Sequence, residues 1–490
     1  MSNELIIGIT VLIFFLALAV IISYYANKVS SNTVDDYFLA GRSLGIVVLA
    51  FTQMATILSG LVFVGGPGIV YATGAGFFSG LTMGTCLAAL MFYIVGRRLW
   101  EIGNKYRFIT PGEFFRDRFE SPGTQIVMLI AMLAFVIPYI ALQPIAGGMA
   151  LSGLTKGAIP YAVGSLIIVV TIIVYVYFGG LRAVAWTDVI QGSAMLVFLW
   201  VLVFVAAGQL GGMSAASEAV KATVPDIFER TGPVGAWGWK AAFSWMCITF
   251  FSISCQPPVF IRFFAAQNMK AIKWLFVLWP LLIVACWAPT VFIGAYGKIL
   301  YPDMAVPDEI SATLIIDYAP LWLAILIFVG LLSAIKSTAD SQFHVLSSML
   351  TRDFYVPFVN QKASTEKQLK VGKWFIVLLG IAGYLVAFKP PELIGFFANS
   401  AFTGIAVLCV PTLAALYWKR ATAAGVIWSV ILGETLALGS FAGIFPKSWW
   451  MGFDAVIPAL ILTTVVLVVV SYFTKLPSEE TINKYFSNAA

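Results

Sequence analysis

Long apolar segments constrain the fold of this 490-residue chain more than any other feature. A helix needs roughly 20 mainly apolar residues to cross the hydrocarbon core of a bilayer, and many segments here reach that length. The composition agrees, because the chain is 60% hydrophobic and 11% charged, whereas soluble domains carry about 25% charged residues. The sequence therefore predicts an all-α integral membrane protein.

About 13 segments satisfy the length rule, and a count of about twelve or fourteen also fits the pattern. They lie near residues 4–25, 45–72, 76–97, 123–149, 157–178, 186–208, 238–264, 273–297, 318–348, 372–388, 393–416, 424–444 and 452–474. The first segment lacks a basic leader and a small-residue cleavage site, so we interpret it as a retained helix. The longest connection, about 209–237, could hold a short surface helix.

Lysine and arginine are unevenly distributed between the two sides of this predicted bundle. With the N-terminus outside, 21 of the 29 basic residues, Arg262 among them, fall in cytoplasmic segments. Seven fall in outer segments, and Lys336 lies within a helix. Because cytoplasmic loops are enriched in basic residues, we expect an outer N-terminus and a cytoplasmic C-terminus. The expected location is the plasma membrane, which in a bacterium is the inner, cytoplasmic membrane.

The chain lacks the residue patterns of an enzyme or a nucleic-acid-binding protein. Five cysteines in apolar runs and one histidine offer no disulfide framework and no metal-ligand cluster. No nucleophile–base pair, phosphate-binding loop or basic stripe with interleaved aromatic residues is present. We therefore expect no catalysis, no nucleic-acid partner and no obligatory protein partner, only membrane lipid and a transported solute.

Two of the predicted helices contain interruptions. The second carries small and hydroxyl residues over Thr52–Gly60 and then Gly65–Gly68, and the seventh carries Ser252–Pro258. Such breaks free carbonyls and amides inside the membrane to bind an ion or a substrate. For either interruption taken alone, the alternative interpretation is a kinked helix that packs against its neighbours through small residues. Two interrupted helices five spans apart favour an inverted-repeat transporter.

Polar residues also gather in the ninth predicted helix. At 3.6 residues per turn, one face carries Ala334, Ser337, Thr338 and Ser341. Hydroxyl and carbonyl oxygens of this kind suit a small hard cation such as sodium. Lys336 and Asp340 lie four residues apart and could pair within the helix. Charges inside a membrane are costly. The pair therefore either takes part in transport or serves only to neutralise its own two charges.

At these residues the chain resembles the sodium:solute symporter family, over nearly its whole length. The motifs that carry the resemblance are Asp35–Gly45, Gly65–Gly68, Gly179–Val184 with Trp186–Asp188, Gln256–Pro257 with Arg262–Phe263, Ser337–Ser341 and Leu346–Asp353. The resemblance implies a LeuT-type core of two inverted five-helix repeats in a single transporter domain, residues 1–490. Its parts would be a leading helix and loop (4–44), a first repeat (45–208), a second repeat (238–416), two trailing helices (424–474) and a cytoplasmic tail (475–490).

The resemblance also implies a coupling sodium ion between the second and ninth helices. The ligands carried over by position are the carbonyls of Ala55, Leu58 and Ala334 and the hydroxyls of Ser337 and Thr338. A second cation site, used by some members, would be lined by Asp188, Asp340 and Ser341. Asp188 lies near a helix start, where a solvated carboxylate is the alternative interpretation.

Lys336 departs from the family pattern, in which an apolar residue usually precedes the Ser-Thr pair. Its ammonium could replace or repel sodium, or couple transport to protons. Alternatively it faces away from the site, held by Asp340 or Asp188. Position 336 is about 100° around the helix from Ser337, so both orientations are possible.

The substrate is expected at the bilayer midplane, between the two interrupted helices. Candidate contacts are Gln53, Thr56, Ser59, Tyr139, Gln143, Phe251, Ser252 and Ser254. No arginine is expected at the midplane, so a bidentate carboxylate clamp is absent. A carboxylate would need hydroxyls and the N-terminal amides of a broken helix instead.

Two local patterns suggest a small organic acid as the substrate. Ile137–Gln143 resembles the fourth helix of the family's monocarboxylate permeases, while Val64–Gly68 and Lys389–Glu392 resemble its pantothenate permeases. Proline or another amino acid is an alternative, although Ile57 stands where proline carriers have an acidic residue. A sodium-independent or proton-coupled carrier is a further alternative.

Two other classes of protein remain as rivals, a channel and a sensor built on a transporter core. A channel would need a continuous pore and usually oligomeric symmetry. A sensor would need an output domain, and only about fifteen residues follow the last predicted helix.

Overall fold

The computed structural model describes residues 33–388 and 394–486, together with six positions between 10 and 25. Most of the predicted helix 4–25, the Lys389–Glu392 pattern and the last four residues of the predicted tail lie outside the described residues. The described part is helical, which confirms the all-α membrane fold.

Nine continuous helices in the described ranges are long and apolar enough to cross a membrane. They are Phe78–Tyr106, Pro122–Leu154 (α8), Gly180–Gln209, Met269–Leu300 (α13), Leu321–Val359, Thr365–Ala387 (α16), Ala398–Tyr417, Ala423–Phe441 (α19) and Val456–Phe473 (α20). Two bent pairs could each form one further span, and Tyr161–Val174 is a shorter apolar helix. The count of 13 stays a prediction.

The remaining helices are shorter pieces of spans or connections. The π-helix η3 (Phe78–Thr82), α5 (Met83–Met91), the π-helix η4 (Phe92–Gly96) and α6 (Arg97–Tyr106) make one span, and α17 (Ile394–Val407) precedes α18 (Cys409–Tyr417). Helix α15 (Leu321–Met349) continues into the π-helix η8 (Leu350–Val359). The connections hold α2 (Val34–Leu39), α7 (Pro111–Phe119), α10 (Met213–Thr223), α14 (Ile310–Tyr318) and α21 (Glu479–Phe486). Helix α10 is the surface helix expected within 209–237.

The first bent pair breaks earlier than the glycine–proline run suggests. Helix α3 (Ile46–Ile57) ends at Leu58, whose φ of −83° and ψ of 86° leave the helical region. The chain resumes as the π-helix η2 (Leu61–Gly65) and α4 (Gly66–Thr73), bent by 60° from α3. The Ser59 hydroxyl accepts a hydrogen bond from Leu61 N at 3.1 Å, so it caps the new start. Gly65–Gly68 therefore lies inside the second half.

The second bent pair breaks where its prolines require it. Helix α11 (Trp239–Ser252) runs through the 3₁₀ turn η6 (Ile253–Cys255) to Gln256, whose ψ of 125° is extended. A proline disfavours helical geometry at the residue before it and fits the first turn of the next helix. Pro257 and Pro258 accordingly begin α12 (Pro257–Ala265), bent by 45° from the first half.

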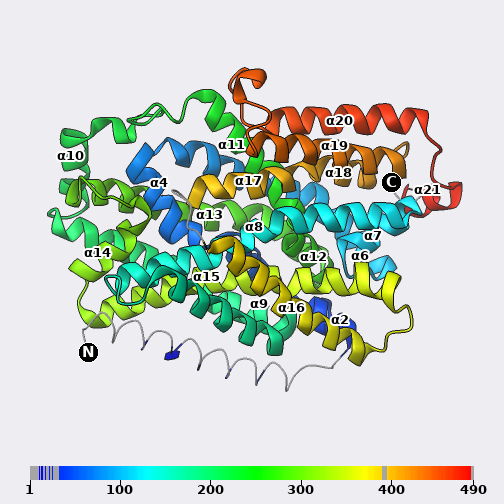
Figure 1. The fold of residues 1–490 in the computed structure, drawn as a ribbon, viewed down its shortest axis with the longest axis horizontal. Coiled ribbons are helices and arrows are strands. Elements are labelled where there is room, and N and C mark those ends of the chain that lie inside the picture. Colours follow the sequence, from blue (N-terminus) through cyan, green and yellow to red (C-terminus); the bar gives the residue numbers. More distant parts are fainter. Residues whose placement is uncertain are drawn as a thin grey trace.

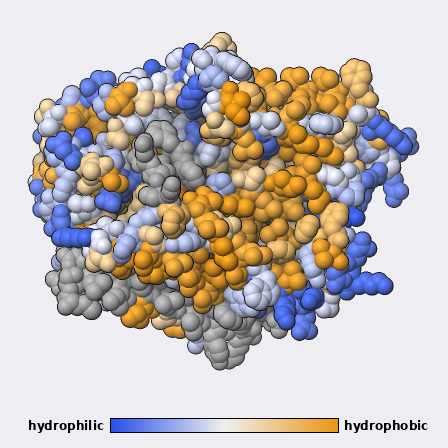
Figure 2. Space-filling view, viewed as in Figure 1, coloured by the Kyte–Doolittle hydropathy of each residue, from blue (hydrophilic) through white to orange (hydrophobic). Residues whose placement is uncertain are grey.

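Helix α15 lies at the centre of the bundle. It contacts α3, α8, α9 (Tyr161–Gln209), α12 and α16. In Figure 1, α19 and α20 lie along the upper edge, whereas α10 and α14 mark one end of the molecule and α7 and α21 the other. Figure 2 shows apolar residues between two hydrophilic ends, as a bilayer requires. Large apolar side chains such as Leu281, Trp428 and Ile461 are exposed on the molecule.

Gly180 separates the two helical segments within α9. Its φ of 62° and ψ of 174° belong to a region that is essentially restricted to glycine. A Cβ atom there would also lie 3.1 Å from the Tyr37 ring. We expect Gly180→Ala to lower the free energy of unfolding by about 1–3 kcal/mol, measured as a fall in thermal unfolding temperature.

Gly208→Ala is the matched control for this substitution. Gly208 lies in the second segment of α9, and apart from its chain neighbours and the adjacent backbone of its own helix no atom lies within 4 Å of an added Cβ. Alanine there should be neutral or stabilising by up to about 1 kcal/mol, since alanine favours helix over glycine. Equal unfolding temperatures for the two variants would show that the backbone at Gly180 imposes no special requirement.

Candidate functional site

The predicted sodium ligands meet where α15 crosses the break in α3. The Ser337 hydroxyl donates to the carbonyl of Ala55 at 3.0 Å and to that of Ala334 at 3.2 Å. The Thr338 hydroxyl donates to the same Ala55 carbonyl at 2.9 Å. All four residues are buried. Leu58, the fifth predicted ligand, ends the same broken helix.

The donor set suits a hard monovalent cation. The last carbonyls of a helix lack partners within it and carry the negative end of its dipole. The last turn of α3 presents such carbonyls, of which that of Ile57 accepts from the Tyr139 hydroxyl at 2.8 Å. The Ala55 carbonyl faces the two hydroxyls instead. With sodium bound between these oxygens, the two hydroxyls would keep their protons but turn them away from the Ala55 carbonyl, so that oxygen lone pairs alone would hold the ion.

A second polar cluster lies one turn further along α15. Asp188 on α9 pairs with Arg262 on α12, with 3.2 Å between Oδ2 and Nη2. Arg262 Nη2 also donates to the Ser341 hydroxyl at 2.6 Å. Thr52 accepts from Arg262 Nε at 2.9 Å and donates to Asp188 Oδ2 at 2.5 Å. The Thr56 hydroxyl donates to Ser341 at 2.9 Å, which connects this cluster to α3.

The position of Arg262 differs from the one expected from the sequence. It was counted with the cytoplasmic residues, yet its side chain is fully buried among α3, α9 and α15. Hydropathy does not reveal the burial of Arg262, because this residue lies close to the end of an apolar segment. The Arg262–Phe263 motif was the sequence feature that could have indicated a role inside the bundle. Asp188 is likewise fully buried and paired, which excludes the solvated helix-start interpretation.

Lys336 forms an ion pair with Asp340. The ammonium nitrogen lies 2.7 Å from Asp340 Oδ2, and both side chains are buried. Of the two carboxylates considered as its partner, Asp340 is therefore the one in direct contact. Asp340 Oδ1 has no hydrogen-bond partner among the described residues.

Most predicted substrate contacts line the break in α3. Gln143 on α8 accepts from Gly60 N at 3.4 Å, and Gln53 donates to Val259 O on α12 at 3.4 Å. Tyr139 and Ser59 also lie at this break, through the contacts given above. A glycine is required at position 60, because a Cβ there would lie 2.6 Å from that of Ala146.

The three substrate candidates of α11 and η6 have different surroundings. Ser252 is buried, and its hydroxyl has no hydrogen-bond partner in the described ranges. Ser254 lies beside the Cys255 thiol at 3.8 Å. Phe251 is half-buried and lines an apolar pocket with Leu460 of α20. The structure thus does not bring Phe251 to the polar cluster at the breaks.

Gln256 was not among the predicted contacts. It is fully buried at the break between α11 and α12, and neither its amide nitrogen nor its oxygen has a partner among the described residues. Gln53 lies close by, because its amide reaches the first turn of α12. A buried amide without partners is costly, so Gln256 joins the candidate substrate contacts.

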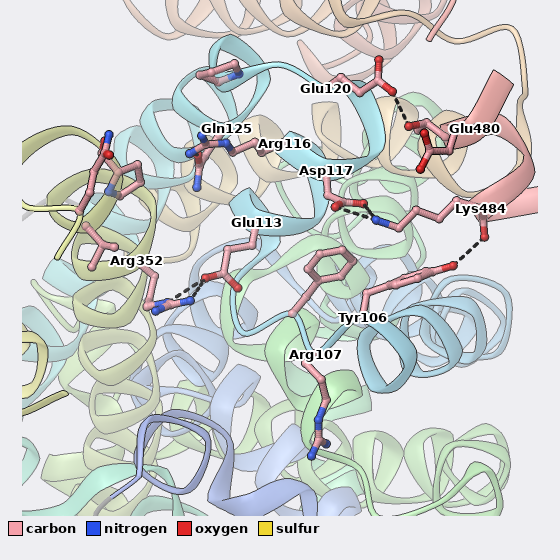
Figure 3. A pocket seen from close by; sticks show the side chains of 16 residues that line it. Tyr106, Arg107, Glu113, Arg116, Asp117, Glu120, Gln125, Arg352, Glu480 and Lys484 are labelled. Atoms are coloured by element: carbon pink, nitrogen blue, oxygen red, sulfur yellow. Dashed lines mark hydrogen bonds and ion pairs between the residues drawn. The ribbon is translucent and has the colours of Figure 1, made fainter. Parts of the chain in front are cut away.

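A separate polar pocket of about 870 Å³ opens between α7, η8 and α21 (Figure 3). Glu113 on α7 pairs there with Arg352 on η8, and Asp117 pairs with Lys484 on α21 at 2.6 Å. Hydrogen bonds from Ser478 and Thr481 hold the pKa of Glu120 below its usual range. These contacts fasten the C-terminal helix to α7. None of the residues that line this pocket belongs to the two interrupted helices.

We expect Asp117→Asn to loosen α21. Asp117 accepts from both Lys484 and the Tyr485 hydroxyl, at 2.6 Å each. A half-exposed ion pair contributes about 0.2–1 kcal/mol. Hydrogen exchange of the α21 amides should therefore become roughly two- to five-fold faster. Glu479→Gln, on an exposed side chain of the same helix, is the control. Equal exchange in the two variants would contradict the assigned role of Asp117.

Comparison with known proteins identifies the family. Residues 37–433 match the sodium:solute symporter family. The chain belongs to this family. It is thus a multi-pass membrane transporter and not an enzyme, as the sequence predicted.

Individual relatives of this symporter cover nearly all of its length. It is 29% identical over 470 residues to the sodium/pantothenate symporter of Escherichia coli (strain K12), covering 94% of this chain and 95% of the relative. It is 28% identical over 500 residues to the osmoregulated proline transporter OpuE of Bacillus subtilis (strain 168), covering 98% and 96%.

Solved structures show the same fold. A substrate-bound, outward-open Na⁺-coupled sialic acid symporter matches with a TM-score of 0.79 at 20% identity, covering 96% of this chain and 99% of that one. Mhp1, a nucleobase-cation-symport-1 family transporter, matches with a TM-score of 0.62 at 13% identity, covering 93% and 98%. The LeuT-type architecture expected from the resemblance is confirmed.

Proposed function

We propose that this symporter couples the uptake of a small organic acid to sodium entry. The observation that carries the proposal is the contact of the Ser337 and Thr338 hydroxyls with the Ala55 carbonyl at the break in α3. Sodium at these oxygens would join α3 to α15, so that ion binding would stabilise one arrangement of the two helices. A ligand shifts such an equilibrium by its difference in affinity for the two arrangements.

The substrate is proposed to lie between the two helix breaks, among side-chain amides and hydroxyls. Gln53, Gln143 and Gln256 are buried there and offer both donors and acceptors. The start of α12 offers few backbone donors, because Pro257 and Pro258 lack N–H groups and Phe260 N donates to Gln256 O at 2.9 Å. A carboxylate would therefore be held chiefly by glutamine amides and serine hydroxyls.

Within this class we favour a hydroxyl- or amide-bearing acid of the pantothenate type over a simple monocarboxylate. Three buried glutamines and Ser252 can satisfy several polar groups on one substrate, more than lactate or pyruvate carries. The sodium/pantothenate symporter of Escherichia coli is among the relatives. Proline is the alternative within the family, supported by the likeness to OpuE.

A proton-coupled or sodium-independent carrier is the second candidate function, favoured by the buried Lys336. The ammonium of Lys336 is paired with Asp340, while the hydroxyls of Ser337 and Thr338 contact the Ala55 carbonyl. This arrangement leaves the two hydroxyls to the sodium site, and it therefore supports the sodium-coupled proposal over the second candidate.

We further propose a bacterial cytoplasmic membrane location with the N-terminus outside, on the distribution of basic residues.

Uptake into proteoliposomes tests both candidates. Labelled pantothenate, lactate, pyruvate and proline would each be supplied with an inward sodium gradient, or with choline in place of sodium at the same pH. We expect sodium to stimulate saturable uptake of pantothenate above the other three. Saturable uptake that is indifferent to sodium would favour the second candidate. Flux without saturation or counterflow would indicate a channel and would contradict both.

A further inference from the structure

The three residues that would line a second cation site are already engaged with side chains of this chain. Asp340 Oδ2 lies 2.7 Å from the Lys336 ammonium. Asp188 Oδ2 lies 3.2 Å from the Arg262 guanidinium. Both carboxylates are fully buried, so each is neutralised inside the protein by a cation that belongs to the chain itself.

The hydroxyl of Ser341 is also occupied. It accepts one hydrogen bond from Arg262 Nη2 at 2.6 Å and a second from the Thr56 hydroxyl at 2.9 Å. A hydroxyl oxygen has two acceptor lone pairs. Both are therefore used, and Ser341 cannot ligate a metal ion without losing one of these bonds.

The charges of the cluster lead to the same conclusion. Two buried carboxylates face one guanidinium and one ammonium, which leaves no net negative charge to attract another cation. A further cation would lie within a few ångströms of two buried positive charges, where the low dielectric constant strengthens repulsion. The guanidinium cannot relieve this repulsion by losing its proton.

We propose that Arg262 and Lys336 are permanent occupants of the second cation site, so that this symporter carries one sodium ion per substrate. The residues present do not fit a second sodium ion. The single ion would bind at Ala55, Ser337 and Thr338, and to that extent the inference rests on the proposed function. Lys336 is the decisive residue, because its ammonium lies 2.7 Å from Asp340 Oδ2 and neutralises that carboxylate directly.

Counting bound sodium tests the inference without knowledge of the substrate. Radioactive ²²Na⁺ would be titrated against the purified full-length protein in lipid nanodiscs. We expect one ion per chain in the natural protein and none in the Ser337→Ala/Thr338→Ala variant. Two ions per chain in the natural protein would overturn the inference while leaving sodium coupling intact. No bound ion would instead overturn sodium coupling itself, and the proposed function with it.

Lys336→Met tests the role of the ammonium directly. With Asp340 freed, we expect the count to rise from one to two sodium ions per chain. Lys370→Met, which removes an exposed lysine of α16, should stay at one. Lys336→Met/Asp340→Asn removes both charges, avoids an unpaired buried carboxylate, and should also stay at one. A count of one in folded Lys336→Met, or of two in the double variant, would overturn the inference.

Discussion

Thr338→Ala is expected to weaken the apparent affinity for sodium by roughly 10- to 100-fold. Its hydroxyl lies 2.9 Å from the Ala55 carbonyl, at the proposed contact between α15 and the broken helix α3. Losing one interaction with a charged group costs about 1.5–3 kcal/mol, and each 1.4 kcal/mol corresponds to about ten-fold in affinity. The sodium concentration that gives half-maximal uptake measures the effect.

Two matched variants make this result specific. Thr338→Ser retains the hydroxyl and should retain most of the sodium affinity. Ser348→Ala removes another buried hydroxyl of α15, one that donates to its own helix at Val345 O, and should leave the sodium dependence unchanged. An unchanged sodium dependence in Thr338→Ala, with saturable uptake preserved, would remove Thr338 from the proposed ligands.

Arg262→Met is expected to destabilise the protein by about 3–5 kcal/mol. The substitution leaves Asp188 fully buried without its cation and deprives Ser341 and Thr52 of a donor. Removing one partner of a buried ion pair is costly because the remaining charge has no compensation. A thiol-reactive dye can follow thermal unfolding, because Cys247, Cys255, Cys286 and Cys409 are buried and free.

Two further variants separate charge pairing from the loss of an arginine as such. Arg262→Met/Asp188→Asn removes both charges and should recover part of the lost stability. Arg116→Met removes an exposed arginine of α7 and should change stability by less than about 1 kcal/mol. Equal losses in the single and double variants would show that Arg262 stabilises the bundle by packing and not by neutralising Asp188.

The sequence by itself determined the membrane fold, the two broken helices and the polar face of the ninth predicted helix, which is α15 in the structure. These features depend on local chemistry. Apolar length decides which segments enter lipid, prolines such as Pro257 decide where a helix stops, and helical periodicity places Ser337, Thr338 and Ser341 on one face. The membership of the family followed from motifs that these same segments carry.

Tertiary structure alone decided which polar groups meet across the bundle. Arg262 pairs with Asp188, which lies 74 residues earlier in the chain. The end of α12 is buried in the protein, so Arg262 is not at the cytoplasmic surface. Periodicity allowed Lys336 either of two carboxylates, and the packing of α15 against α9 and α3 left Asp340 as the direct contact. Phe251 turned toward α20 for the same reason. Local pattern specifies the faces of a helix, whereas its rotation and depth are set by all the neighbours that pack against it.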